Sequence, residues 1–254
     1  MNKAILIISV GTSETAALEA TTMRMQQEAT EKFGLPCYVA YSSKFILKRM
    51  QEKETGEYLG IADAVTRMKA DGIEEAYVQP TYLLNGVEME DMTAQITEAA
   101  GTDFSVKISR PLLMGKPDYV QALEHILDDV KLTEEEALVL IGHGTSHLAN
   151  TTYQNFEYTA YMQGCRNVFV GTMKEERSRQ MVLRKIAASG YRRIRLMPLL
   201  FVAGYHAKRD LINGDGSWEK SLMEAGCDVA VYMKGLGEIQ GIRDMFLQNL
   251  QEIL

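Results

Sequence analysis

The sequence repeats itself, and this repeat constrains the fold more than any other feature. The stretch AILIISVGTS at Ala4–Ser13 matches ALVLIGHGTS at Ala137–Ser146, 133 positions further on. The stretch ADGIEEAYVQPTYLLNGVE at Ala70–Glu88 matches ASGYRRIRLMPLLFVAGYH at Ala188–His206, 118 positions further on. The second match keeps two glycines and the proline in place. Such spacing indicates two copies of one structural unit, with loops of different length between their parts.

A third, looser match lies between the other two in both copies, YVAYSSK at Tyr38–Lys44 and FVGTMK at Phe169–Lys174. Short apolar runs alternate with longer amphipathic stretches, which is typical of α/β folds with parallel sheets. The continuous apolar run Ala4–Ile8 is typical of a strand that is buried on both faces. We therefore predict two similar α/β units, each with a parallel sheet of about four strands, and a ligand cleft between the halves.

The segment KLTEEE separates the two copies. We place an N-terminal domain at 1–130 and a C-terminal domain at 131–254. The C-terminal domain contains His143 and His206, which are candidates for metal binding. A C-terminal helix is expected from about residue 240. The sequence leaves open whether it packs on its own half or crosses back to the first domain.

Composition excludes several classes of protein. The chain has 254 residues, of which 46% are hydrophobic, and a net charge of −7 without a basic run, which argues against nucleic-acid binding. No apolar run reaches the roughly 18–20 residues of a membrane span. The start MNKAILIISVGTSE indicates a buried strand rather than a signal peptide, so we expect a cytoplasmic protein. The three cysteines are scattered beside apolar runs and are predicted to be buried thiols.

Two histidines lie where predicted strands of the second copy end. His143 follows a buried strand between two glycines that permit a tight turn, and His206 ends the stretch PLLFVAGYH. Glu88 occupies in the first copy the position of His206 in the second. In parallel sheets, ligands bind at the carboxyl ends of the strands. His125 falls within a predicted helix, where a packing or surface role is expected, and His147 lies in the first turn of the predicted helix that follows His143.

Two imidazoles and one carboxylate suit a divalent ion such as Co²⁺, Ni²⁺, Fe²⁺ or Zn²⁺. The set is too small for a closed structural zinc site, so it indicates a metal that is handled or transferred. The alternative is that each histidine caps its own loop and that Glu88 is a solvated glutamate near a helix N-terminus.

Other motifs carry weaker signals. The turns SVGTS and GHGTS resemble phosphate-cradling loops but lack the glycine spacing of nucleotide-binding motifs, so no nucleotide cofactor is expected. Ser13 and Ser146 lack the G-x-S-x-G context of a hydrolase nucleophile.

With these residues in hand, the chain resembles the class II tetrapyrrole chelatases, and most of all the anaerobic sirohydrochlorin cobaltochelatases of cobalamin biosynthesis. The segments that carry the resemblance span nearly the whole chain in the family's order: SVGTS, NGVEMED, RPLLMGKPDYVQAL, GHGTSH, LMPLLFVAGYHAKRD, DGSW and GLGEIQGIRDMF. The pair of histidines is specific, because the related protohaem ferrochelatases typically place one histidine and one glutamate there. Val10 stands where the family suggests an aromatic residue, and Tyr205 stands where it suggests an acid.

The resemblance implies two facing Rossmann-like α/β domains with a tetrapyrrole bound between them, with His143 and His206 binding the metal and Glu88 assisting. It implies insertion of Co²⁺, as a substrate, into sirohydrochlorin without ATP, with a histidine or Glu88 accepting a pyrrole proton. The residues expected to contact the substrate are Ser9, Val10, Gly11, Thr12, Arg110 and Tyr205. The cations expected to face its carboxylates are Lys44, Arg110, Lys208 and Arg209.

Two alternatives remain open at this stage. A cytoplasmic carrier of metal or tetrapyrrole would use the same residues without joining the two ligands. A nickel or iron chelatase of the same fold is the nearest alternative within the enzyme class. The expected partners are a tetrapyrrole and a divalent metal, without nucleic acid or membrane, and a homo-oligomer is left open.

Overall fold

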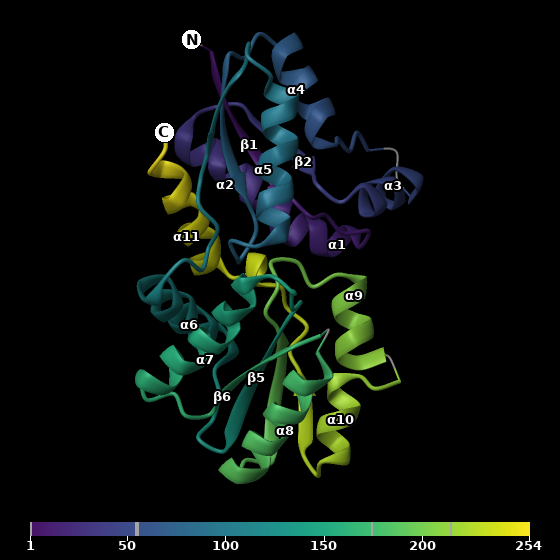
Figure 1. Cartoon of the computed structure of the whole chain (residues 1–254), viewed down its shortest axis with the longest axis vertical. Coiled ribbons are helices and arrows are strands. Elements are labelled where there is room, and N and C mark those ends of the chain that lie inside the picture. The colour runs from purple at the N-terminus through teal and green to yellow at the C-terminus, as the bar shows by residue number, and fades with distance from the viewer. Residues whose placement is uncertain (1, 54–55, 174, 214) are drawn as a thin grey trace. The chain divides into compact units, whose positions relative to one another are not determined.

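The structure is a computed structural model that describes residues 2–53, 56–173, 175–213 and 215–254 (Figure 1). The chain divides into two compact units. The first comprises Met1–Met114 with Ile242–Leu254, and the second comprises Gly115–Gly241.

The first unit contains a four-stranded parallel sheet in the order β2-β1-β3-β4. Its elements are β1 (Lys3–Ser9), α1 (Thr15–Leu18), the π-helix η1 (Glu19–Met23), α2 (Arg24–Phe33), β2 (Cys37–Tyr41), α3 (Lys44–Lys53), α4 (Ile61–Ala70), β3 (Glu75–Pro80), α5 (Val87–Ala100), β4 (Ser105–Ile108) and, for its greater part, α11 (Gln240–Gln251).

The second unit contains another four-stranded parallel sheet, in the order β6-β5-β7-β8. Its elements are α6 (Lys116–Val130), β5 (Glu136–Gly142), the short 3₁₀ helix η2 (Leu148–Asn150), α7 (Thr151–Met162), β6 (Val168–Thr172), α8 (Glu176–Ser189), β7 (Arg193–Pro198), α9 (Tyr205–Lys208), the π-helix η3 (Arg209–Asn213), α10 (Trp218–Glu224), β8 (Asp228–Val231) and the 3₁₀ helix η4 (Leu236–Glu238).

The two sheets share their strand order and their register. Ile5 pairs with Tyr77 in the first sheet. In the second sheet Leu138, which lies 133 positions after Ile5, pairs with Arg195, which lies 118 positions after Tyr77. These are the two spacings of the sequence repeat, so the predicted pair of similar parallel α/β units is confirmed. The cleft predicted between the units stays a prediction.

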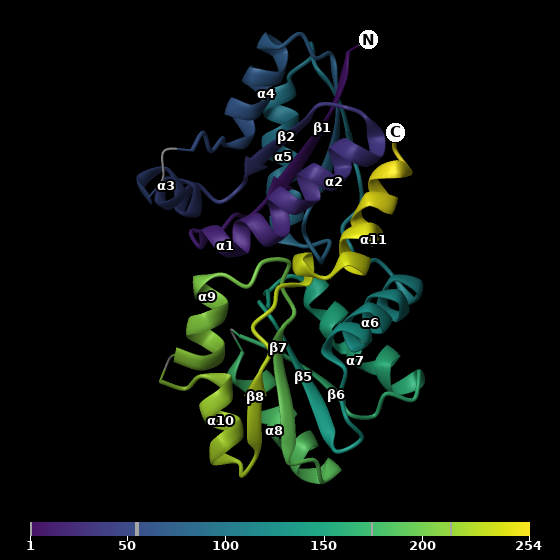
Figure 2. The ribbon, with the colours of Figure 1, turned by 180° about the vertical axis from the view of Figure 1, so that it is seen from behind.

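Helices cover both faces of each sheet, which is why the central strands are apolar on both sides. In the first unit α4 and α5 cover one face (Figure 1), and α2 and α11 cover the other (Figure 2). Ala4, Leu6 and Ile8 of β1 face the α4–α5 layer in one core cluster. In the second unit the alternate residues of β5, Ala137, Val139 and Ile141, pack with α8 and α10.

The compact units differ from the predicted domains at both ends of the second copy. The boundary predicted at 130/131 shifts to 114/115, because α6 packs on the second unit. The ring centroids of Tyr119 in α6 and Phe156 in α7 lie 6.1 Å apart in an edge-on contact. Asp129 in α6 accepts hydrogen bonds from Tyr232 (2.8 Å) and Lys234 (2.6 Å), which follow β8.

The C-terminal helix α11 belongs to the first unit from Ile242 onward, which answers the question left open by the sequence. Arg243 of α11 is nearly buried and forms two hydrogen bonds to Glu28 of α2, at 2.8 and 3.0 Å. Burial works to raise the pKa of the Glu28 carboxyl, but the hydrogen bonds and charge of Arg243, helped by Arg24, outweigh it and hold that pKa below its usual range.

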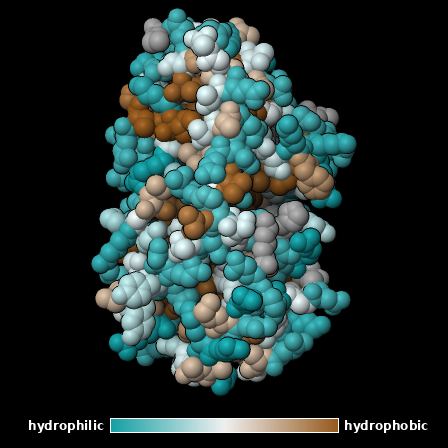
Figure 3. All heavy atoms as spheres, viewed as in Figure 1, coloured by the Kyte–Doolittle hydropathy of each residue, from teal (hydrophilic) through white to brown (hydrophobic). Residues whose placement is uncertain are grey.

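Hydrophilic residues dominate the face shown in Figure 3, where apolar residues form small separate patches. In the described ranges, no helix is both long and apolar enough to cross a membrane.

The Glu28–Arg243 pair generates a prediction about stability. Replacing Glu28 by Gln removes the carboxylate that pairs with the nearly buried guanidinium of Arg243, which costs on the order of 3 kcal/mol. Because the pKa of Glu28 is lowered in the folded protein, its contribution is present above its usual pKa of 4.5 and is lost as the pH falls toward the folded value. The Glu28→Gln variant should therefore unfold several degrees earlier at pH 7, and the difference from the parent should shrink on acidification.

Thermal unfolding followed by circular dichroism between pH 3 and pH 7 measures both effects. Glu52→Gln is the matched control, because Glu52 pairs with Lys48 at 3.9 Å on the exposed surface of α3 and should cost under about 1 kcal/mol. A pH-independent loss in Glu28→Gln, equal to that of the control, would contradict this account.

Candidate functional site

The turn that carries His143 leaves directly from β5 and requires both glycines that flank it. A Cβ at Gly142 would lie 2.1 Å from the ring of Tyr153, and one at Gly144 would lie 2.9 Å from Cβ of Thr172. Gly144 also has a φ of +77°, where side chains other than hydrogen are strained. The Gly144 N–H donates to the Tyr153 hydroxyl at 3.4 Å. The half-buried His143 is therefore held by a backbone that is packed on both sides.

The first unit repeats this turn with different chemistry at its tip. Gly11 matches Gly144 and has a φ of +92°, while Val10 occupies the position of His143. Ser9 and Thr12 are buried, and their hydroxyls accept hydrogen bonds from the backbone N–H groups of Gly11 (3.3 Å) and Glu14 (3.2 Å). Of the four residues predicted to contact substrate here, Val10 presents an exposed side chain, and the others shape the turn.

His206 and Glu88 lie at equivalent positions in the two units. Each is the second residue of the helix that follows the third strand, α9 for His206 and α5 for Glu88. Those strands end at the matched prolines Pro198 and Pro80. Glu88 is exposed in the first turn of α5, where a carboxylate is favoured by the helix dipole. The side chain of His206 lies outside the described part of the structure.

The loop that leads to His206 is held by the segment that follows the fourth strand. The N–H of Leu236 donates to the carbonyl of Leu200 at 2.8 Å, and the N–H of Gly237 donates to that of Phe201 at 2.8 Å. This approach depends on a glycine at 235, where a Cβ would lie 2.6 Å from the Phe201 carbonyl oxygen. The backbone before His206 is therefore fixed by contacts that tolerate little change.

The loop that leads to Glu88 is held in the same way. Leu112 N–H donates to the Tyr82 carbonyl at 3.0 Å, and Leu113 N–H donates to the Leu83 carbonyl at 2.8 Å. Tyr82 and Leu83 lie 118 positions before Leu200 and Phe201, so the repeat extends to these backbone bonds.

The segments of His143 and His206 leave from neighbouring strands of one sheet, because β5 pairs with β7. Leu199 N–H donates to the Ile141 carbonyl at 2.8 Å, just beyond the last paired residues. The adjacency that the two-histidine site requires is therefore present. Among the described side chains, no three of His, Cys, Asp and Glu form a metal-binding cluster, and the complete set with His206 stays a prediction.

Negative charge gathers around Tyr82, beneath the start of α5. The pKa of Tyr82 is raised to about 12, mainly by burial and partly by the charges of Glu88 and Asp91, against the hydrogen bond to Ser42, which lowers it. The Tyr82 hydroxyl donates to Ser42 Oγ at 2.7 Å, so it stays protonated and serves to hold the loop. The start of α5 thus exposes three carboxylates, those of Glu88, Glu90 and Asp91.

The predicted cations lie at the surface. Arg110 follows β4 and pairs with Glu252 of the C-terminal segment, Nε to Oε2 at 3.5 Å. Arg209 pairs with Asp210 at 2.7 Å, and the charge of nearby Tyr205 adds to the rise in its pKa that Asp210 causes. Tyr205 is about half exposed at the start of α9. Exposed pairs of this kind are weak and can exchange for a ligand carboxylate.

The two remaining histidines have structural roles. His125 of α6 packs so closely on Gly241 that a Cβ there would lie 2.2 Å from its Nδ1. His147 caps η2, since its Nδ1 accepts the N–H of Ala149 at 3.1 Å. The packing or surface role predicted for His125 agrees with this contact.

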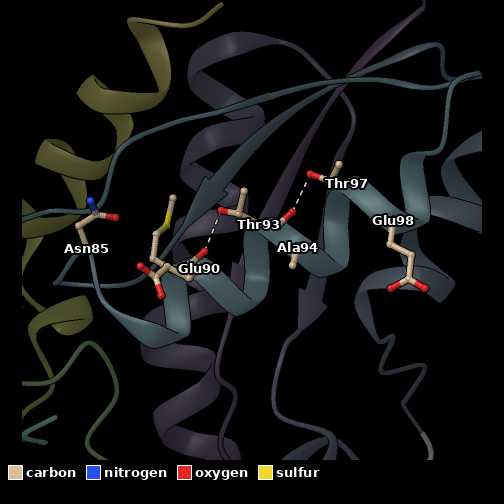
Figure 4. A pocket seen from close by; sticks show the side chains of 7 residues that line it. Asn85, Glu90, Thr93, Ala94, Thr97 and Glu98 are labelled. Carbon is tan, nitrogen blue, oxygen red and sulfur yellow. Dashed lines mark hydrogen bonds between the residues drawn. The ribbon is translucent and has the colours of Figure 1, made fainter. Parts of the chain in front are cut away.

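A shallow groove runs along one face of α5 (Figure 4). The hydroxyls of Thr93 and Thr97 within it donate to backbone carbonyls one turn earlier, at 2.7 Å each. Its two carboxylates, Glu90 and Glu98, make it unsuitable for an anionic ligand. The lining residues are Asn85, Met89, Glu90, Thr93, Ala94, Thr97 and Glu98.

Comparison with known proteins identifies the family. A family model described as cobalt chelatase (CbiK) matches residues 3–254. The chain belongs to the cobalt chelatase (CbiK) family. A sirohydrochlorin cobaltochelatase of Salmonella typhimurium is 27% identical over 100% of this chain and 97% of its own length. The sirohydrochlorin cobaltochelatase CbiKC of Nitratidesulfovibrio vulgaris is 27% identical over 98% of this chain and 89% of its own.

Solved structures agree on the fold. The structure of SirB from Bacillus subtilis with Fe³⁺ superposes with a TM-score of 0.70 at 16% identity, covering 100% of this chain and 96% of that one. At that identity the likeness shows that this cobalt chelatase family member has the two-unit α/β fold of the SirB structure.

Sequence reasoning missed the residues that support the candidate ligands. Tyr153 seals the turn before His143, and Gly235 admits the segment that holds the His206 loop. Gly235 lies in the stretch GLGEIQG, which is part of a segment that carries the resemblance to the family. The sequence does contain a signal for this contact, because a pair of glycines outside any strand pattern indicates that two backbone segments approach closely.

Gly235→Ala should disturb the site through the loop alone. The new Cβ would meet backbone atoms of Phe201 and Ala203, which cannot turn away as a side chain can. We expect a loss of stability of about 1–3 kcal/mol from overpacking and a measurable loss of Co²⁺ affinity. Urea unfolding and titration with Co²⁺ measure the two effects.

Gly115→Ala provides the matched control. Its φ of −169° suits any residue, and its Cβ would meet nothing closer than 3.8 Å. Equal behaviour of the two variants would show that the Gly235 contact does not position the loop.

Proposed function

We propose that this protein inserts Co²⁺ into sirohydrochlorin, without ATP, as a step of anaerobic cobalamin biosynthesis. The observation that carries the proposal is that His143 and His206 follow the neighbouring strands β5 and β7 of one sheet. Membership of the cobalt chelatase family and the names of its two relatives support the same reaction. A cytoplasmic location and the absence of a nucleotide cofactor and of nucleic-acid partners stay predictions.

His143, His206 and Glu88 are proposed to hold the incoming metal. Neutral imidazoles ligate divalent cobalt well, and a carboxylate adds charge without closing the coordination sphere. With three protein ligands, coordination positions on the metal stay open. The pyrrole nitrogens of the substrate can occupy these positions while the protein ligands dissociate. The ion is therefore a substrate that passes through the site.

Insertion also requires that two pyrrole N–H protons leave the macrocycle. A ligand that releases the metal becomes free to accept a proton, so a histidine or Glu88 can take that role. Glu88 suits it, because it is exposed at a helix N-terminus and can pass the proton to solvent.

The carboxylates of sirohydrochlorin need cations that can exchange their partners. Arg110 and Arg209 lie at the ends of their elements in weak surface pairs, and Lys44 and Lys208 complete the proposed set. Val10 and Tyr205 are proposed to contact the macrocycle, since both side chains are exposed. Val10 occupies the position of His143 in the repeat, and Tyr205 directly precedes His206. The acidic groove along α5 is not proposed as the substrate site, because its carboxylates would repel the substrate.

His206→Ala and His143→Ala should each lower the rate of Co²⁺ insertion by about 100-fold or more, because the metal loses one of two imidazole ligands. Glu88→Gln should cost about 10- to 100-fold, since proton acceptance contributes on that order. The assay follows the absorbance of sirohydrochlorin with Co²⁺, anaerobically and without ATP, above the spontaneous rate.

Glu90→Gln is the matched control for Glu88→Gln, because both residues are exposed in the first turn of α5. Full activity of His206→Ala would remove the site assignment. Binding of both substrates without insertion by the parent protein would favour a carrier. Faster insertion of Ni²⁺ or Fe²⁺ would assign a different metal.

A further inference from the structure

Trp218 anchors the segment that begins with His206 to the second sheet. It is fully buried, and its ring lies so close to Gly171 of β6 that a Cβ there would approach its Cη2 to 2.5 Å. It shares a core cluster with Leu211 of η3. Ala207 and Leu211 are both buried, one turn apart, so this side of α9 and η3 is attached to the same core. In both views α9 and α10 lie next to one another (Figures 1 and 2).

Arg179 of α8 fixes this anchor from the other side. Its guanidinium carbon lies 5.4 Å from the centre of the Trp218 ring. Its Nη1 donates to the carbonyl of Gly216 and lies 3.5 Å from Ser221 Oγ. Gly216 adopts a φ of +80°, and Ser217 then caps α10 by accepting from Lys220 N–H at 3.3 Å. One planar side chain thus joins α8 to the turn that ends the His206 segment.

The contacts of Arg179 and Trp218 do not satisfy all of their buried donors. The side chain of Arg179 is 17% exposed, and its ion pair is to the exposed Glu176 at 3.8 Å. Among the described residues, the buried Nε atoms of Arg179 and Trp218 have no hydrogen-bond partner. A buried donor without an acceptor is unfavourable. Local costs of this kind are expected where function constrains a residue.

The segment that Arg179 secures also has an unusual backbone. Residues Arg209–Asn213 form a π-helix directly after α9. Single π-turns are rare and recur at functional sites. The wider turn makes the orientation of α9 depend on contacts made further along, at Leu211 and Trp218.

We propose that Arg179 is a positioning residue for His206, acting through Trp218 and η3 on the orientation of α9. The inference rests on the proposed function, because it takes His206 as a metal ligand. Arg179 itself contacts neither the metal nor the tetrapyrrole in this account. It is a residue that orients a metal ligand without contacting the metal. Loss of such residues typically lowers metal affinity 10- to 100-fold.

Arg179→Lys tests the proposal, because lysine keeps the charge but loses the planar group that spans Trp218 and Gly216. We expect the Kd for Co²⁺ to rise and kcat to fall by about tenfold each, with the KM for sirohydrochlorin within about twofold. The Kd is measured with Co²⁺ alone, from its visible absorption bands, whose shape also reports the ligand geometry. Arg184→Lys, an exposed arginine on the same helix, is the matched control.

A double-mutant cycle with His206→Ala separates positioning from general damage. If Arg179 acts through His206, Arg179→Lys should have no further effect on the Co²⁺ Kd once His206 is absent. Additive effects would overturn the proposal, as would a lower unfolding temperature with an unchanged Co²⁺ Kd and spectrum. A raised KM with unchanged kcat would assign Arg179 to the substrate instead.

A second variant guards against loss of folding. Trp218→Phe keeps an aromatic ring in the slot beside Gly171 and should change Co²⁺ affinity in the same direction, again only when His206 is present. If the parent protein fails to insert cobalt but its Co²⁺ binding still depends on His206, the proposed chelatase activity is wrong. The link between Arg179 and His206 is then still testable, and it stands if the double-mutant cycle shows coupling.

Discussion

The candidate site depends on one backbone arrangement that both units share. After the third strand of each sheet, the chain is held by two hydrogen bonds from the segment that follows the fourth strand. These bonds fix where the next helix begins, and the second residue of that helix is Glu88 in one unit and His206 in the other. Because the bonds are between backbone atoms, the side chain at that position is free to change while its placement stays constant.

This division between framework and side chain explains how a repeated fold carries an asymmetric site. The turns after β1 and β5 have the same left-handed glycine, at Gly11 and Gly144, yet their tips carry Val10 and His143. Both histidines therefore fall on one sheet, whose strands β5 and β7 are neighbours. At the matching positions the first unit carries Val10, an exposed apolar residue, and Glu88, an exposed carboxylate.

The unsatisfied buried side-chain atoms that the structure describes all lie in the second unit. Among the described residues, the buried side-chain atoms without a hydrogen-bond partner are Thr172 Oγ1 and the Nε atoms of Arg179, Arg195 and Trp218, all within that unit. Thr172 packs beside Gly144, and Arg179 with Trp218 supports the segment that begins with His206. A core built only for stability would have filled these places with apolar groups.

The sequence by itself determined the strands, their parallel direction within each half and the equivalence of Glu88 and His206. These follow from local pattern and from the constant spacings of the repeat, which the register reproduces. Tertiary structure alone decided where the units divide, because α6 and α11 are amphipathic helices that could cover either sheet. Their assignment rests on contacts between distant residues, such as Asp129 with Tyr232 and Glu28 with Arg243. The supports of the site were hidden for the same reason, since the close packing of Tyr153 on Gly142 and of Trp218 on Gly171 arises only when the strands and helices meet.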